Sequence, residues 1–218
     1  SGRVNDVVRD PDTGDLYVGG DFTAIDGVAA ARVARWDGAR WVSLGAGVGA
    51  VRDDTVTALA WDRSSRRLYA AGRFALAGGV AAANIAVWDG AAWQALGAGL
   101  RADDSLCVCE LVLDSARGRL FAMGEFDDAG DAGVSNIAMW DGTRWNRLQS
   151  GLSGPVGHAS LRDADGALFV TGTFSTAGGV SSPGLALWDG AAWQAMERPP
   201  GGLTATAWDA ETGTLLGF

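Results

Sequence analysis

The sequence predicts an all-β fold made of tandem four-stranded antiparallel units, and three observations predict it. A Trp-Asp-Gly motif recurs in four segments: VARWDGARW, IAVWDGAAW, IAMWDGTRW and LALWDGAAW. Short apolar runs of strand length, bounded by turn-forming residues, surround each copy of the motif. The 33 glycines, with only five prolines, suit the turns and close contacts of a β-rich protein.

The motif marks four complete repeats within one repeat domain that spans residues 1–218. A phenylalanine lies fourteen residues before the first tryptophan of each motif, and a glycine lies two residues before that phenylalanine. A period this regular indicates one supersecondary unit per repeat. We place the repeats at about residues 4–55, 56–107, 108–155 and 156–202, with a partial fifth repeat at 203–218.

Each repeat contains four extended runs, which the second repeat shows at residues 56–62, 67–74, 84–88 and 91–96. The Asp-Gly pair between the third and fourth runs predicts a two-residue type I′ hairpin turn. Such a turn pairs Trp36 with Ala39, and therefore Ala34 with Trp41. An alanine would then face the second tryptophan of every motif, and we interpret this as volume-matched packing.

A glycine within the second run, as at Gly72, predicts close approach of two backbones. Four strands per repeat, together with this glycine, predict a blade of a β-propeller. The segment LTATAWDAETGTLLGF matches only the first strand and part of the second strand of a further blade. We therefore expect part of a larger array or a five-bladed ring, in which more of the polypeptide or a partner chain completes the last blade.

The segments GGDFTAIDGVAAARVARWDGARWVSLGAGV and GRFALAGGVAAANIAVWDGAAWQALGAGL resemble kelch-like repeats of large secreted bacterial proteins. They also resemble the repeats of fungal cortical polarity marker proteins, which are cell-surface proteins. The resemblance implies an extracellular β-propeller of the broad galactose-oxidase-like class. It does not extend to the copper chemistry of galactose oxidase, because this chain has one histidine and two tyrosines. Small five-bladed invertebrate lectins are a looser likeness in repeat length and tryptophan content.

The charge and the apolar pattern exclude two classes of partner. The formal net charge is −9, and a nucleic-acid partner would require a basic face. No run of about 18 apolar residues is present, so we expect no direct membrane insertion. The N-terminus lacks a signal-peptide pattern, and all 17 basic residues are arginines, which removes lysine-dependent chemistry.

Few residues outside the motif carry candidate chemistry. His158 is the only histidine and has no ligand cluster at metal-binding spacing, so we expect a structural or surface role. Cys107 and Cys109 point to the same face of an expected strand. Free buried thiols are the expected state, since residues so close along a strand rarely reach disulfide geometry. A bridge between the two cysteines, or a bond to another chain, is the alternative in an oxidising compartment.

We therefore expect no catalytic residue, no metal site and no cofactor, while the ligand-binding residues stay unassigned. The residues of the structural repeat motif are the following: Trp36, Asp37, Gly38, Trp41, Trp88, Asp89, Gly90, Trp93, Trp140, Asp141, Gly142, Trp145, Trp188, Asp189, Gly190 and Trp193.

This inventory favours a non-catalytic β-propeller, extracellular or at the cell surface, that serves as a structural or protein-interaction module. Its partners would be other protein chains or the rest of a longer polypeptide. The alternative is a carbohydrate-binding, lectin-like propeller whose blade-top loops, such as residues 74–84, set specificity.

Overall fold

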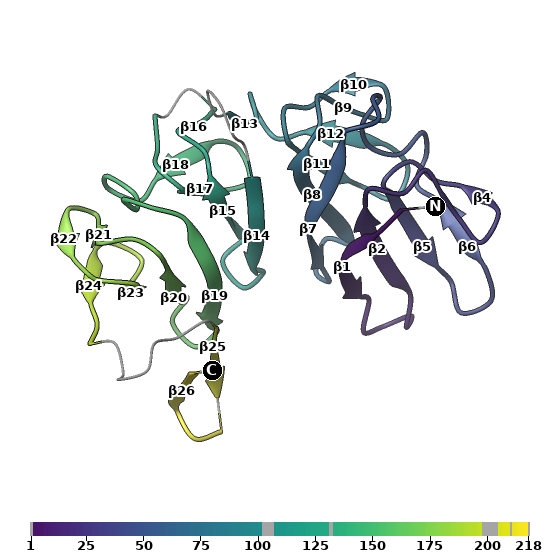
Figure 1. Cartoon of the computed structure of the whole chain (residues 1–218). Helices are drawn as coiled ribbons and strands as arrows, with labels where there is room; N and C mark the ends of the chain where they lie inside the picture. Colours follow the sequence, from purple (N-terminus) through teal and green to yellow (C-terminus); the bar gives the residue numbers. More distant parts are fainter. Residues whose placement is uncertain (1, 102–106, 131–132, 198–204, 210, 218) are drawn as a thin grey trace.

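The computed structural model describes residues 2–101, 107–130, 133–197, 205–209 and 211–217. Every regular element in these residues is a β-strand, and most strands belong to four-stranded antiparallel sheets (Figure 1). The prediction of an all-β fold built from four-stranded units is therefore confirmed.

Each complete blade is one sheet whose strands follow chain order from one edge to the other. The first blade contains β1 (Val4–Arg9), β2 (Leu16–Gly20), β5 (Val33–Trp36) and β6 (Trp41–Ser43). The second contains β7 (Thr55–Asp62), β8 (Arg67–Arg73), β11 (Ile85–Trp88) and β12 (Trp93–Ala95). The third contains β14 (Cys107–Asp114), β15 (Arg119–Glu125), β17 (Ile137–Trp140) and β18 (Trp145–Arg147). The fourth contains β19 (Val156–Arg162), β20 (Ala167–Gly172), β23 (Leu185–Trp188) and β24 (Trp193–Ala195). A final hairpin contains β25 (Thr206–Asp209) and β26 (Thr214–Gly217).

Short ribbons, which the repeat pattern alone does not reveal, extend from the blades between their second and third strands. Three of them are hairpins: β3 (Ala24–Ile25) with β4 (Val28–Ala29), β9 (Leu76–Ala77) with β10 (Val80–Ala81), and β21 (Thr176–Ala177) with β22 (Val180–Ser181). In the third blade, β16 (Asp128–Ala129) pairs instead with β13 (Leu100–Arg101), which precedes that blade in the chain.

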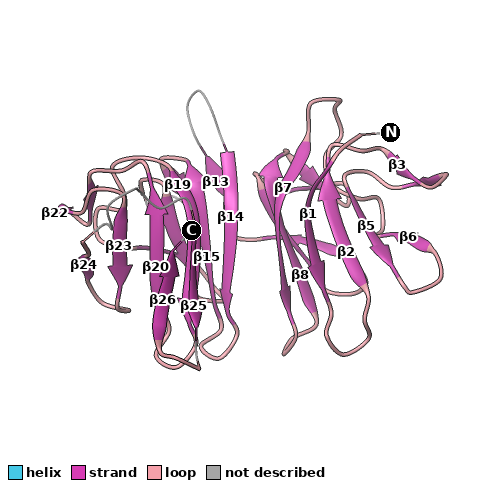
Figure 2. Ribbon diagram, turned by 60° about the horizontal axis from the view of Figure 1, so that its bottom comes forward, coloured by secondary structure: helices cyan, strands magenta, loops and turns pink. Residues whose placement is uncertain are grey.

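The first strands of successive blades lie side by side. β1 lies next to β7, β7 next to β14, β14 next to β19, and β19 next to β25. Figure 2 shows β1, β7, β14 and β19 running in similar directions, and Figure 1 shows the sheets following one another in chain order along an arc. Buried apolar clusters combine residues of neighbouring blades, so the core lies between the sheets.

A β-bulge interrupts the first strand of every complete blade at the same position. Asn5, Thr57, Cys109 and Gly157 are the extra residues. Opposite the second bulge, a Cβ placed on Gly72 would lie 2.1 Å from the Thr55 carbonyl oxygen. The predicted close backbone approach at this glycine is therefore confirmed, and the bulge is its cause.

The predicted register of the motif hairpin is wrong. Trp36 pairs with Trp41, and Ala34 pairs with Ser43, so the connecting loop has four residues and alanine does not face the second tryptophan. The same tryptophan pairing recurs in the other three blades. The physical reason is the Asp37 side chain, whose Oδ1 accepts hydrogen bonds from the backbone N–H groups of Ala39 and Arg40. These bonds hold a wider loop than a type I′ turn.

Two-residue turns occur instead at the tips of the ribbons. In the first ribbon Ile25 pairs with Val28, and the two residues between them, Asp26 and Gly27, have φ of 47° and 78°. Positive φ at both central residues is what a type I′ turn requires, and the glycine tolerates it without strain.

Candidate functional site

The tryptophans of the motif join one blade to the next. The indole N–H of Trp93 donates a hydrogen bond to the carbonyl oxygen of Leu44, in the preceding blade, at 2.9 Å. Trp145 and Trp193 donate in the same way to Leu96 and Leu148, at 2.9 and 3.0 Å. All three indoles are 4–5% exposed. The second tryptophan of these motifs therefore acts between blades, with its polar atom paired.

The first tryptophan of each motif packs against the second across the hairpin. Their ring centroids lie 5.4–5.6 Å apart, at interplanar angles of 54–58°. The motif aspartates are occupied by their own loops. Backbone N–H groups of Arg40 and Ala39 hold the pKa of Asp37 below its ordinary value, and equivalent bonds lower the pKa of Asp89 and Asp189. The pKa of Asp141 is lowered first by the Thr143 hydroxyl and then by the backbone N–H of Arg144. These carboxylates are acceptors of turn hydrogen bonds.

His158 lies on β19 and meets a carboxylate of the preceding blade. Its Nδ1 lies 3.2 Å from Oε2 of Glu110 on β14. Burial raises the pKa of Glu110, and the nearby His158 opposes that shift. Within the described ranges, no group of three or more His, Cys, Asp and Glu side chains is arranged to hold a metal ion.

Cys109 occupies the bulge of β14 and is disulfide-bonded. The expectation of a free thiol at Cys109 is therefore wrong. The alternative prediction, a bridge between Cys107 and Cys109, depends on the side chain of Cys107, which lies outside the described residues.

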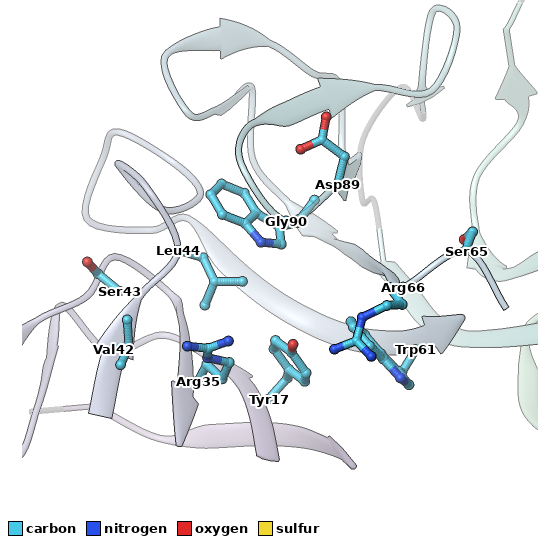
Figure 3. Close-up of a pocket in the computed structure, with 11 residues that line it drawn as sticks. Tyr17, Arg35, Val42, Ser43, Leu44, Trp61, Ser65, Arg66, Asp89 and Gly90 are labelled. Carbon is cyan, nitrogen blue, oxygen red and sulfur yellow. The ribbon is translucent and has the colours of Figure 1, made fainter. Parts of the chain in front are cut away.

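A pocket of about 530 Å³ lies between the first and second blades (Figure 3). The first blade contributes Tyr17, Arg35, Val42, Ser43 and Leu44, and the second contributes Trp61, Ser65, Arg66, Trp88, Asp89 and Gly90. Pockets of this size accommodate compact ligands. The sequence alone predicted no ligand-binding residue, and of these eleven residues Trp88, Asp89 and Gly90 were expected only as structural motif residues.

The floor of this pocket is aromatic. The rings of Tyr17 and Trp61 are stacked at a centroid distance of 4.7 Å. Tyr17 is 5% exposed, whereas Trp61 and Trp88 are half-buried and keep accessible indole surface. Burial raises the pKa of the Tyr17 hydroxyl, and a hydrogen bond with Arg35 opposes that shift. The phenol therefore stays protonated at neutral pH and adds no negative charge to the pocket.

Arg35 and Arg66 add positive charge on either side of Tyr17 in Figure 3. Arg35 Nη1 lies 3.4 Å from Asp15 Oδ2, and Arg66 Nη2 lies 3.6 Å from Asp10 Oδ2. Their side chains are 38% and 60% exposed, respectively. Both guanidinium groups therefore keep surface that a ligand can reach.

A comparison of the repeats with one another would have found both arginines. At the position of Arg35, the other complete blades have Val87, Met139 and Leu187. At the position of Arg66, before the second strand, the other hairpins have glycine: Gly14, Gly118, Gly166 and Gly213. Departures from a repeat pattern are the signal, because positions kept in every blade serve packing and turns.

No family model and no curated protein matches this chain. Solved structures do resemble it. Over 95% of this chain and 69% of the other, it matches the nidogen/laminin complex at a TM-score of 0.59 and 14% identity. A GH74 xyloglucanase from Xanthomonas campestris matches at a TM-score of 0.57 and 17% identity, over 96% of this chain and 34% of the xyloglucanase. U3-55K matches at a TM-score of 0.60 and 11% identity, over 94% of this chain and 55% of U3-55K.

At these identities the likeness establishes the fold alone. The matched structures are β-propeller proteins, in agreement with the four-stranded antiparallel sheets described above. This chain therefore has a β-propeller fold. It spans little more than half of U3-55K and about a third of the xyloglucanase.

Proposed function

We propose that this chain is a non-catalytic protein-interaction module, related to the kelch-like propellers and acting outside the cell or at its surface. One observation carries the proposal: the side chains that recur in every blade are engaged in packing and turns. The second tryptophans of the motifs in the second to fourth blades donate hydrogen bonds to the preceding blades, and the motif aspartates accept hydrogen bonds from their own loops. A rigid scaffold with variable loops is suited to holding other proteins.

Two further observations support this proposal. Val80 and Val180, at the tips of equivalent ribbons, are 49% and 42% exposed and offer apolar contacts. A structure of the same fold is a complex of nidogen with laminin, so the fold serves protein association in that case. In the described residues, no helical segment has the length and hydropathy needed to cross a membrane.

The proposal is tested by native mass spectrometry of the protein isolated from its source without overexpression. We expect a stable complex with other polypeptides, and weaker association when Val80→Ser and Val180→Ser are combined. Val51→Ser is the control, because Val51 is 62% exposed and lies outside the ribbons. Turnover of a substrate that is abolished by one polar substitution would overturn the non-catalytic assignment.

A second candidate function, saccharide binding, is favoured by the pocket between the first two blades. It combines half-buried indoles with hydroxyl and guanidinium donors, as in sites that bind a sugar ring. The xyloglucanase of the same fold acts on a polysaccharide, which makes saccharide recognition compatible with this architecture.

A further inference from the structure

The two arginines of the pocket between the first and second blades are not required by the fold. The equivalent third-strand positions of the other blades hold apolar residues, and the equivalent hairpin positions hold glycines. The structure brings both departures, Arg35 and Arg66, to a single pocket although they lie on different blades. Convergence of two independent departures in one pocket points to a ligand.

The backbone of Arg66 strengthens this argument. Its φ is 54°, in the left-handed region, where the four equivalent glycines have φ between 63° and 83°. A residue with a side chain adopts this conformation at a cost in free energy that glycine does not incur. A contact of its guanidinium group with a ligand would offset this cost.

Arg32 is another arginine with a left-handed backbone conformation, and contacts within the fold account for its side chain. Arg32 has φ of 64°, but it is 5% exposed and its guanidinium donates to the carbonyl oxygens of Asp54 and Val51 at 2.8 and 2.5 Å. Arg66 is 60% exposed, and its ion pair with Asp10 spans 3.6 Å. Asp10 already accepts hydrogen bonds from the Asp12 backbone and the Thr13 hydroxyl. Contacts within the fold therefore account for the guanidinium group of Arg32, whereas the guanidinium group of Arg66 stays accessible to a ligand.

The chemistry of the walls defines the ligand. Two guanidinium groups favour a carboxylate, which they can bind through charge-assisted hydrogen bonds. The indoles of Trp61 and Trp88 offer apolar surface for one face of a ring, and Ser43 and Ser65 offer hydroxyl groups. A compact pocket of about 530 Å³ suits a ring better than an extended peptide.

We propose that this pocket binds an acidic saccharide, a pyranose that carries a carboxylate, with Arg35 and Arg66 holding the carboxylate. The proposal rests on the second candidate function and specifies its site and ligand class. Partial occupation of both arginines by Asp15 and Asp10 limits the affinity, because the ligand has to compete with these carboxylates.

The test is a titration of the full chain, followed by NMR of the tryptophan indole N–H signals and by calorimetry. Three probes separate the parts of the ligand: D-glucuronate has ring and carboxylate, D-glucose has the ring alone, and N-acetylglutamate has a carboxylate without the ring. We expect D-glucuronate to bind about tenfold more tightly than either other probe at low salt, and to weaken as salt is added.

The variants restore the residues that other repeats already have. Arg66→Gly and Arg35→Val should each keep the protein folded, because glycine and valine occupy these positions elsewhere in the array. We expect each to weaken D-glucuronate binding about tenfold. Arg144→Ala is the control: it removes the same charge from a side chain that is 78% exposed and lies outside the pocket.

Each result has one meaning. Preference for D-glucuronate that both pocket variants reduce and Arg144→Ala leaves unchanged supports the proposal. Equal binding of D-glucose, unaffected by the variants, overturns the acidic ligand while the saccharide function stands. Equal binding of N-acetylglutamate overturns recognition of a ring and favours an acidic peptide. Absence of binding by all three probes overturns both the proposal and the second candidate function, and leaves the interaction function untouched.

Discussion

Replacing Trp145 by phenylalanine should destabilise the junction between the second and third blades. The substitution removes the indole N–H that donates to the Leu96 carbonyl oxygen at 2.9 Å, in an environment where the indole is 5% exposed. Leaving a buried carbonyl without its donor costs about 1–3 kcal/mol. The smaller ring also leaves a cavity that costs about 1 kcal/mol. We therefore expect a loss of about 2–4 kcal/mol in the free energy of unfolding.

The first blade provides the matched control. Trp41 occupies the same motif position, but it is only half-buried, and its indole donates no hydrogen bond to any residue that the structure describes. Trp41→Phe should therefore cost less than about 1 kcal/mol.

Unfolding in guanidinium chloride, followed by far-ultraviolet circular dichroism, measures both variants without relying on tryptophan fluorescence. The slope of the free energy of unfolding against denaturant concentration has to match that of the unsubstituted chain, since repeat arrays can unfold in steps. Equal losses for Trp145→Phe and Trp41→Phe would refute the assignment of the indole hydrogen bond as a blade-to-blade interaction.

Three further predictions concern glycine, charge and strain. Gly72→Ala should lower the free energy of unfolding by roughly 3 kcal/mol, because the added Cβ would lie 2.1 Å from a carbonyl oxygen. Gly79→Ala has no atom within 4 Å of the added Cβ, so it should cost only the strain of a φ of 85°, about 1 kcal/mol. Denaturant midpoints compare the two variants, and equal losses would contradict the clash at Gly72. Asp141 has a pKa lowered from 3.8, first by the Thr143 hydroxyl, so its stabilisation is present above pH 3.8 and lost as pH falls through the lowered value. Asp141→Asn should flatten the stability profile below about pH 4, and an unchanged profile would exclude this carboxylate as its source. Arg66→Gly should leave thermal stability unchanged or raise it by up to about 1 kcal/mol, and a clear loss measured by calorimetry would show that its ion pair with Asp10 outweighs the backbone strain.

The repeat pattern predicted the four-stranded units because strand length and turn chemistry are local properties. The register of the motif hairpin was not predictable from the Asp-Gly pair alone. The same dipeptide serves a two-residue turn at Asp26-Gly27 and a four-residue loop at Asp37-Gly38. In the second case the carboxylate caps two backbone N–H groups, and such a bond depends on the conformation that the following residues adopt.

The candidate site depends on contacts between blades, which one repeat considered alone does not contain. The stacking of Tyr17 on Trp61 joins residues of different sheets, and periodicity within a sheet carries no information about it. Arg35 and Arg66 are different, because their departures from the repeat pattern are visible in the aligned copies. The sequence thus contained the signal for both arginines, while their meeting in one pocket could be identified only from the packing of the sheets.

The hydrogen bonds from Trp93, Trp145 and Trp193 to the preceding blades give the array a direction and allow repeats to be added. A repeat carries both halves of the junction: an indole such as Trp93 that reaches backward and a carbonyl such as that of Leu96 that receives the next blade. A duplicated repeat would therefore arrive with a donor for the blade before it and an acceptor for the blade after it. Blade number can then change in whole units without a new interface, while a deletion within a repeat would remove one half of a junction and leave its counterpart unpaired.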